Sequence, residues 1–230
     1  MICEGTALFV AYGGGHVSMV LPVIEALRSR APGVKCVLLA LTTGYRKAVS
    51  ANAKPVGYKD FLHLVNAQAV RDWGRRLYEE NFSPDVSEEE SIAYLGINYL
   101  DLVEQHGAER AADIYAREGR YGFRPVPFMR RVMDEIKPDV VVATNSPRSE
   151  RAALDVAIER GIPSIGMIDL FGQETDTYVS HQPRPDITCV ISESVKSRLR
   201  SQGFDSEHVV VTGSPAFDGL FSTDTQSAAQ

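Results

Sequence analysis

Short apolar runs rich in aliphatic residues recur along the chain, and each is followed by a polar or glycine-containing segment. They span residues 6–12, 35–41, 139–144, 162–168, 187–192 and 208–213. A strand that is buried on both faces is continuously apolar, whereas a half-exposed strand alternates apolar and polar residues. These runs therefore predict strands in the interior of a sheet.

Helical spacing follows most of these runs. After the first run, apolar residues recur every three to four positions, as they do on one face of a helix: Val17, Val20, Leu21, Ile24 and Leu27. Ser18 is available as the cap of this helix, and further helices are expected over residues 150–160 and 193–202. Strands that alternate with helices are typical of parallel βαβ units. We therefore expect an α/β fold with a doubly wound parallel sheet of the Rossmann type.

The middle of the chain, residues 61–136, loses the strand pattern and is rich in helix-forming residues. We interpret it as a helical insertion in a single Rossmann-like domain over residues 1–221, with residues 222–230 as a disordered tail or the start of a linker. Within the insertion, residues 79–90 contain six acidic side chains and no basic one. A solvated loop before a helix start explains this composition, and a functional acidic cluster is the alternative.

Composition narrows the classes of function. The 230 residues are 44% hydrophobic, as in ordinary globular proteins, and a formal net charge of -6 lacks the basic surface that binds nucleic acid or an anionic membrane. No apolar run is long enough to span a bilayer, so we expect a cytoplasmic protein with at most peripheral contact at the inner membrane face. Cys3, Cys36 and Cys189 lie far apart without a CxxC pair. This spacing argues against a metal site or a disulfide framework and for buried free thiols.

Ligands of a doubly wound sheet bind beyond the carboxyl ends of its strands, so the loops after the strands are the candidates for chemistry. The first loop contains Gly13, Gly14 and Gly15, whose backbone N–H groups at a helix start could bind phosphate or another anion. The spacing matches neither GxGxxG nor a Walker loop, and a purely structural turn is the alternative. His16 follows, and its side chain could act as a general base or hydrogen-bond donor, or could simply begin the helix.

The second loop follows the run at 139–144 and contains Asn145, Ser146 and Arg148. Its arginine could grip an anionic group of a ligand, with the two polar side chains beside it. A capped helix start with a solvent-facing arginine is the alternative interpretation. We take all three residues as candidates for substrate binding.

The third loop follows the run at 162–168 and offers Asp169 and Glu174. A carboxylate just past a buried strand could orient a sugar hydroxyl or act as a base, and capping of a local turn is the alternative. We take Asp169 as a catalytic candidate beside His16, and Glu174 as a candidate for substrate binding.

Four segments together resemble the amino-terminal domain of GT-B glycosyltransferases and of their relatives, the UDP-N-acetylglucosamine 2-epimerases. They are AYGGGHVSMVLPVIEAL (11–27) and residues 138–169, 187–199 and 209–220, about half of the chain. Within this superfamily, the strongest likeness is to N-acetylglucosaminyltransferases that act on lipid-linked muramoyl-pentapeptide. Those enzymes also join their first strand to a helix with an early proline through a glycine-rich loop that contains Gly-Gly-His.

The resemblance implies that this chain is the acceptor-binding half of a glycosyltransferase, whereas a carboxyl-terminal domain or partner chain grips the nucleotide sugar. The reaction would then need no metal ion and no other cofactor, and the chain alone is expected to be inactive. Its ligands would be a nucleotide sugar and a glycan or lipid-linked acceptor. By the same resemblance, residues 13–15 would approach the acceptor or donor phosphates, His16 would act as base or orienting group, and residues 145–148 would line the acceptor pocket.

Two other functions fit the same resemblance. The chain could be a non-catalytic binding or scaffold subunit that keeps the fold and recruits a partner. It could also be a relative of the sugar-nucleotide epimerases, although those begin with a Gly-Thr-Arg-Pro-Glu loop where this chain has Gly-Gly-Gly-His (13–16). Because a complete GT-B protein has a second domain of similar size, we expect either an excised domain or a split subunit.

Overall fold

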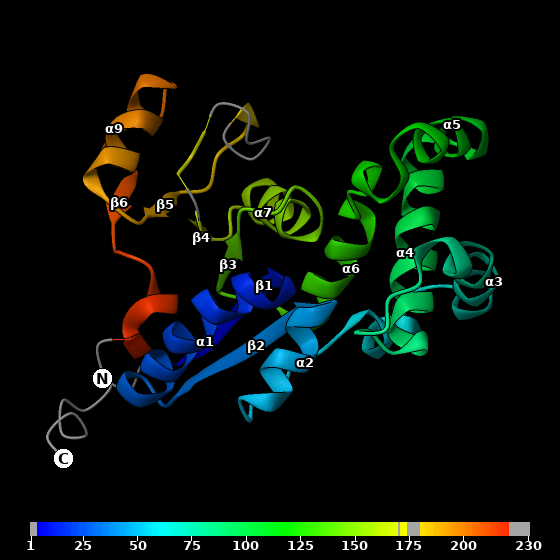
Figure 1. Ribbon diagram of the computed structural model, residues 1–230, viewed down its shortest axis with the longest axis horizontal. Coiled ribbons are helices and arrows are strands. Elements are labelled where there is room, and N and C mark those ends of the chain that lie inside the picture. Colours follow the sequence, from blue (N-terminus) through cyan, green and yellow to red (C-terminus); the bar gives the residue numbers. More distant parts are fainter. Residues whose placement is uncertain (1–3, 170, 174–179, 221–230) are drawn as a thin grey trace, which may run out of the picture.

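A computed structural model describes residues 4–169, 171–173 and 180–220 of the chain. Its centre is a parallel sheet of six strands in the order β2-β1-β3-β4-β5-β6 (Figure 1). The strands are β1 (Gly5–Tyr12), β2 (Val34–Leu41), β3 (Val140–Thr144), β4 (Ser164–Met167), β5 (Ile187–Val190) and β6 (Val209–Val211). Nearly every residue of these strands falls in one of the six predicted apolar runs, and the predicted α/β fold with a doubly wound parallel sheet is confirmed.

The sheet changes its direction of growth at β1. Phe9 in β1 pairs with Leu38 of β2 on one side and with Val142 of β3 on the other. The chain therefore leaves β2, passes through the helical middle and returns on the opposite side of β1. Sheets of this kind open a crevice for ligands at the carboxyl ends of the two strands where the order reverses, which here are β1 and β3.

Alternate residues of β1 face two different layers of helix. Ala7, Phe9 and Ala11 pack in one apolar cluster with residues of α1 (Gly13–Arg30) and α2 (Thr43–Ser50). Leu8 and Val10 pack in another, with residues of α7 (Ser149–Arg160), of α9 (Glu193–Ser201) and of the helical middle. These five strand residues are no more than 1% exposed. Both faces of the strand are therefore covered, which is why its sequence is continuously apolar.

One helix begins earlier than the sequence pattern indicates, and another was not predicted. α1 starts at Gly13, directly after β1, and Gly13 has a φ of 78°, a left-handed conformation that glycine adopts without strain. Ser18 therefore lies inside the helix and is not its cap, and its hydroxyl donates a hydrogen bond to the carbonyl oxygen of Gly14 (2.9 Å). α2 was not predicted, because its eight residues bury only Gly44 and Ala48 and carry little apolar pattern.

The helical middle stands beside the sheet. Its elements are η1 (Tyr58–Leu64), α3 (Ala67–Tyr78), η2 (Glu79–Asn81), α4 (Glu88–His106), α5 (Ala108–Glu118), η3 (Gly119–Gly122) and α6 (Val126–Ile136). In Figure 1, α3, α4 and α5 lie together on the side opposite to α9, and α6 lies between them and α7. A Cβ atom at Gly74 would lie 2.1 Å from the carbonyl oxygen of Ile92, and one at Gly96 would lie 2.0 Å from that of Val70. Only glycine allows the backbones of α3 and α4 to approach this closely.

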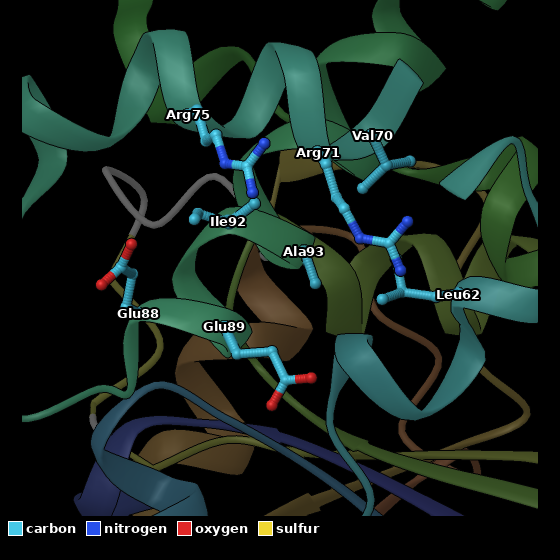
Figure 2. Close-up of a pocket in the computed structure, with 8 residues that line it drawn as sticks. All are labelled: Leu62, Val70, Arg71, Arg75, Glu88, Glu89, Ile92 and Ala93. Atoms are coloured by element: carbon cyan, nitrogen blue, oxygen red, sulfur yellow. The ribbon is translucent and has the colours of Figure 1, made fainter. Parts of the chain in front are cut away.

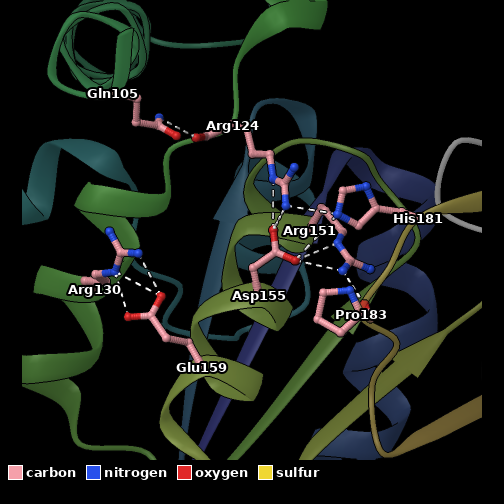
Figure 3. A network of polar contacts seen from close by, with 8 residues as sticks. All are labelled: Gln105, Arg124, Arg130, Arg151, Asp155, Glu159, His181 and Pro183. Carbon is pink, nitrogen blue, oxygen red and sulfur yellow. Dashed lines mark hydrogen bonds and ion pairs between the residues drawn. The ribbon is translucent and has the colours of Figure 1, made fainter.

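A polar network joins this insertion to α7 (Figure 3). Arg124, just before α6, donates through Nε to Asp155 Oδ2 at 2.8 Å, and Asp155 Oδ1 accepts a hydrogen bond from Arg151 Nε, also at 2.8 Å. His181 Nε2 lies 2.9 Å from Arg124 Nη2, and Arg151 also donates to the carbonyl oxygen of Pro183. Burial and the two arginine charges lower the pKa of His181, so the ring stays neutral between them. The network holds the insertion, α7 and the segment before β5 together.

The acidic segment at residues 79–90 is solvated except at its end. Glu90, in the first turn of α4, is 4% exposed, and its two carboxylate oxygens accept the backbone N–H groups of Tyr58 (2.7 Å) and Lys59 (3.0 Å). The expectation of a wholly solvated loop is therefore wrong for Glu90. Its carboxylate supplies acceptors to N–H groups at the start of η1, which have no partner within that short helix.

Two further expectations concern the cysteines and the membrane. Cys36 and Cys189 have free thiols, but they are half-buried rather than buried, and Cys3 lies outside the described residues. Among the residues that the structure describes, no helix combines the length and the apolar character needed to cross a bilayer.

Candidate functional site

Three ionisable side chains meet at the carboxyl end of the sheet. His16 Nε2 lies 3.1 Å from Asp169 Oδ2, and His16 Nδ1 lies 3.6 Å from Glu150 Oε1. The side chains of His16 and Asp169 are 19% and 23% exposed, whereas that of Glu150 is completely buried. We call these three residues the His16 cluster. His16 and Asp169 were predicted site residues, whereas Glu150 was predicted only as the start of a helix.

The residues of the His16 cluster are far apart in the sequence, but each follows one of three neighbouring strands. His16 follows β1, Glu150 follows β3 and Asp169 follows β4, and these strands are adjacent in the sheet. The hydroxyl of Thr144 donates to Glu150 Oε1 (3.4 Å), and Asn145 Oδ1 accepts the backbone N–H of Asp169 (3.2 Å). These bonds fix the loops after β3 and β4 relative to each other. The cluster thus lies where the order of the sheet reverses.

The cluster keeps a proton on His16 at neutral pH. Burial alone would lower the pKa of His16, but its interactions with Asp169 and Glu150 outweigh burial and raise the pKa to about 9. Burial would likewise raise the pKa of Asp169, but the hydrogen bond and charge of His16 outweigh it and hold that pKa below its ordinary value. An imidazolium therefore lies beside a carboxylate. Asp169 Oδ1 is buried and has no hydrogen-bond partner within the described part of the chain.

The three predicted glycines form the first turn of α1, next to His16. The first N–H groups of a helix have no partner within it, and here the N–H of Gly14 donates to the hydroxyl oxygen of Thr43 (3.2 Å). A Cβ atom at Gly15 would meet no other atom within 4 Å, so this turn faces open space. The geometry allows an anion to approach Gly13 and Gly15, and their role in binding stays a prediction.

The turn after β3 is buried. Asn145 and Ser146 are 8% and 5% exposed. Arg148 is the N-cap residue of α7, and its side chain makes no capping hydrogen bond. Its guanidinium carbon lies 4.0 Å from the ring centre of Tyr12, over the face of the ring. The alternative of a side-chain-capped helix start with a solvent-facing arginine is therefore wrong, and binding of substrate by this turn stays a prediction.

A cavity of about 380 Å³ opens between the ends of β1 and β2 and the helical insertion. We call it the strand-end cavity; its lining residues are Tyr12, Gly13, Thr42, Thr43, Asn81, Phe82, Ser83, Val86, Glu90, Ser91, Tyr94 and Arg120. Thr42 has a φ of 52°, which is strained for a β-branched residue, and such strain concentrates at ligand sites. Tyr94 and Arg120 were not predicted as site residues, because no local pattern shows which helix of the insertion faces the sheet.

Figure 2 shows a separate cavity of about 340 Å³ between α3 and α4. Two arginines of α3 lie across it from the two glutamates that begin α4, over an apolar floor. The lining residues are Leu62, Val70, Arg71, Arg75, Glu88, Glu89, Ile92 and Ala93. None of the predicted site residues lines this cavity, so it is not part of the site at the strand ends.

Two predictions for the site remain, one for Glu174 and one for a metal ion. Glu174, the remaining candidate for substrate binding, lies outside the described residues. Within residues 4–169, 171–173 and 180–220, no group of three or more His, Cys, Asp or Glu side chains is arranged to hold a metal ion.

No protein-family model and no curated protein matches this chain. Solved structures do match it. UDP-GlcNAc 2-epimerase from Neisseria meningitidis bound to UDP-GlcNAc has a TM-score of 0.53 and 14% identity, over 94% of this chain and 48% of that one. The MnaA–UDP structure from S. aureus has a TM-score of 0.55 and 14% identity, over 99% and 50%. UDP-GlcNAc 2-epimerase from Methanocaldococcus jannaschii has a TM-score of 0.52 and 11% identity, over 94% and 47%.

The chain has an α/β Rossmann-like fold, and the structures it matches are of the GT-B type. It spans about half the length of these matched structures, in agreement with the predicted resemblance to a GT-B amino-terminal half. At 11% to 14% identity, the likeness concerns the fold.

Proposed function

We propose that this chain is the acceptor-binding half of a GT-B glycosyltransferase, which transfers a sugar from a nucleotide sugar to a lipid-linked or saccharide acceptor. A second half, on the same polypeptide or a partner chain, would hold the nucleotide sugar. The observation that carries this proposal is the His16 cluster: a charged imidazole and a carboxylate with an unpaired buried oxygen, at the point where the sheet order reverses. The fold supports it, because one matched structure is bound to UDP-GlcNAc and another is a co-structure with UDP.

The charge states of the cluster suggest separate roles for His16 and Asp169. Because the pKa of His16 is about 9, the ring is already protonated at neutral pH and cannot take a proton from the acceptor. Asp169 is ionised, and its Oδ1 has no donor in the described structure. We therefore assign the proton acceptor to Asp169 and the orienting role to His16.

The proposed transfer joins the acceptor hydroxyl to the donor sugar and releases the nucleotide diphosphate. The acceptor hydroxyl oxygen forms a bond to the anomeric carbon of the donor sugar, and the bond from that carbon to the nucleotide diphosphate breaks. The diphosphate leaves with the bonding electron pair, and the hydroxyl proton moves to Asp169. The imidazolium of His16 holds the carboxylate in place, and it adds positive charge near the first turn of α1, where the departing phosphates would lie.

The test is transfer by the chain assembled with its nucleotide-binding half, with UDP-GlcNAc as donor. We expect Asp169→Asn to lower kcat by about 10²- to 10⁴-fold, the usual contribution of a general base. His16→Ala should also lower kcat, whereas Asp218→Asn, an exposed residue of η4, should not. Unchanged transfer in both Asp169→Asn and His16→Ala would overturn the catalytic assignment.

A second candidate function is epimerisation of a nucleotide sugar, which is favoured by the names of two of the matched structures described above. Inversion of a carbon next to the anomeric carbon breaks a carbon–hydrogen bond, and it needs no acceptor. Incubation of the assembled protein with UDP-GlcNAc in D₂O separates the two functions. Deuterium incorporation into the sugar without any acceptor supports epimerisation, and release of UDP only in the presence of an acceptor supports transfer.

A further inference from the structure

The strand-end cavity contains a buried donor that the His16 cluster does not use. Tyr94 of α4 is 5% exposed, and its hydroxyl is buried without a hydrogen-bond partner in the part of the chain that the structure describes. Its ring packs edge-on against Tyr58 and Phe123, at centroid distances of 5.2 and 5.9 Å, so its position is fixed by the core. Burial raises the pKa of Tyr94, and the hydroxyl therefore keeps its proton to donate.

Two arginines stand near this hydroxyl. Arg120 of η3 lines the cavity, and Arg148 lies over the ring of Tyr12, which also lines it. The positive charges of Arg120 and Arg148 both act to lower the pKa of Tyr94, against the larger effect of burial. Among residues 4–169, 171–173 and 180–220, the acidic side chains form ion pairs with other arginines and with neither of these two. Arg120 in the cavity wall and Arg148 beside the cavity therefore have no carboxylate at ion-pair distance among the described residues, although the charge of Glu150 acts on Arg148.

One acidic side chain, Glu90, also lines the cavity. Its two oxygens already accept the backbone N–H groups of Tyr58 and Lys59. Burial raises the pKa of Glu90 to about 7, so it is partly protonated at neutral pH. Glu90 therefore opposes an incoming anion less than a free carboxylate would.

We propose that the strand-end cavity binds the oxyanion of a sugar ligand, a phosphate or a carboxylate, through Arg120 and the hydroxyl of Tyr94, with the positive charge of Arg148 beside the cavity. Such groups donate charge-assisted hydrogen bonds to an oxyanion. The rings of Tyr12 and Phe82 give the cavity aromatic surface for the sugar itself. Its volume of about 380 Å³ falls in the range of about 300–1,000 Å³ typical of small-molecule pockets. The inference rests on the proposed function where it identifies the bound sugar as the acceptor.

Binding to the 230-residue chain is measured by isothermal titration with four probes: glucose 6-phosphate, glucuronate, glucose and inorganic phosphate. We expect glucose 6-phosphate or glucuronate to bind on the order of tenfold more tightly than glucose and inorganic phosphate. The preference between the two anionic sugars shows whether the oxyanion is a phosphate or a carboxylate. Binding of glucose as tight as that of both anionic sugars, or no binding of either anionic sugar, would overturn the proposal.

Substitutions in the strand-end cavity test whether the anionic sugar binds there. Arg120→Gln and Tyr94→Phe should each weaken the preferred anionic sugar on the order of tenfold. The matched controls Arg110→Gln, on the exposed face of α5, and Tyr99→Phe, in the core of the insertion, should bind as the parent chain does. Tyr94→Phe removes a hydroxyl without a partner, so its urea midpoint should not fall, which separates lost binding from lost folding. Parent-like affinity in both cavity variants would refute the assignment.

Probe binding and sugar transfer can fail separately. Tight binding of an anionic sugar at Arg120 and Tyr94, in a protein whose assembled form transfers no sugar, supports this inference and contradicts the proposed function. Transfer that depends on Asp169, with no preference for anionic probes, supports the proposed function and contradicts this inference.

Discussion

Buried carboxylates occur in two regions of the molecule, and they differ in what surrounds them. On α4 of the insertion, Glu90 accepts two backbone N–H groups, and Asp101 accepts the N–H of Phe128 (2.8 Å). They are 4% and 3% exposed, and burial raises the pKa of each to about 7. Arg131 Nη1 lies 3.7 Å from Asp101 Oδ1, beyond hydrogen-bond distance. In the His16 cluster, by contrast, the protonated His16 ring lies at hydrogen-bond distance from Asp169 (3.1 Å), and the pKa of Asp169 lies below its ordinary value despite burial.

The two regions also differ in whether each buried carboxylate oxygen has a hydrogen-bond donor. The α4 carboxylates supply acceptors to N–H groups at the starts of η1 and α6, which lack a partner within their own helix. In the His16 cluster, Asp169 Oδ1 and Glu150 Oε2 are buried without a hydrogen-bond partner among the described residues. A buried acceptor without a donor costs about 1–3 kcal/mol. Within the described part of the chain, the carboxylates of the His16 cluster therefore keep buried acceptors without a donor, whereas the α4 carboxylates do not.

The largest expected effect is a loss of sugar transfer when the carboxylate of the His16 cluster is removed, whereas removal of an α4 carboxylate should reduce stability. Asp169→Ala should lower kcat of the assembled enzyme by about 10²-fold or more. Asp101→Ala should leave transfer intact but lower the free energy of unfolding by about 1–3 kcal/mol, because the N–H of Phe128 loses its acceptor. Steady-state kinetics and urea unfolding on both variants provide the measurements. The comparison fails if Asp101→Ala abolishes transfer in a protein that is as stable as the parent.

Stability should depend on pH in two separate windows. The raised pKa values mean that Glu90 and Asp101 bind protons more tightly in the folded chain. Their contribution to stability is fully present below about pH 4 and is lost as the pH rises through about 7. His16 also binds its proton more tightly in the folded chain. Its contribution to stability is present below about pH 6.5 and is lost as the pH rises through about 9. Each shift corresponds to a free energy on the order of 3 kcal/mol.

Urea unfolding between pH 4 and 10 measures these windows. Glu90→Gln should reduce the lower window, in which Asp101 still titrates, and His16→Asn should remove the upper window. Asp113→Asn, an exposed residue of α5, should leave both unchanged. A lower window that persists unchanged in Glu90→Gln would remove Glu90 from this account.

A smaller effect concerns the charge of His16 itself. Asp169→Asn removes a carboxylate at 3.1 Å, so the pKa of His16 should fall from about 9 towards its ordinary value by about 1 unit or more. NMR titration of the ring protons measures this change, and Asp218→Asn is the matched control. A ring that already titrates near 6.5 in the parent chain would contradict the orienting role assigned to His16.

The smallest effect is expected for carboxylates at the surface. Glu159 pairs with Arg130 at 2.7 Å, and the two side chains are 48% and 42% exposed, so solvent screens the pair. Glu159→Gln should not change the urea midpoint measurably.

Asp155→Ala, one turn away on α7 and 11% exposed, should lower the free energy of unfolding by about 1–3 kcal/mol, since Arg124 and Arg151 lose their shared acceptor.

Local pattern was enough to predict the strands, because a strand covered on both faces must be apolar at every position. It was not enough for α2, whose residues bury little, or for the start of α1, where glycines take the place of a polar cap. Within the site, His16 and Asp169 could be chosen singly as polar residues after strands. Their contact could not be predicted, because it joins residues 153 positions apart and depends on which strands are neighbours.

The sequence by itself determined the order of the six strands and the polar loops that follow them. Each of these depends on residues close together in the chain. Only the tertiary structure decided that His16 carries a proton, that Glu150 is buried beside it, and that Tyr94 and Arg120 face the strand ends. The physical reason is that charge state and hydrogen bonding depend on distance and burial, and parallel pairing of six strands sets both between residues that no local pattern connects.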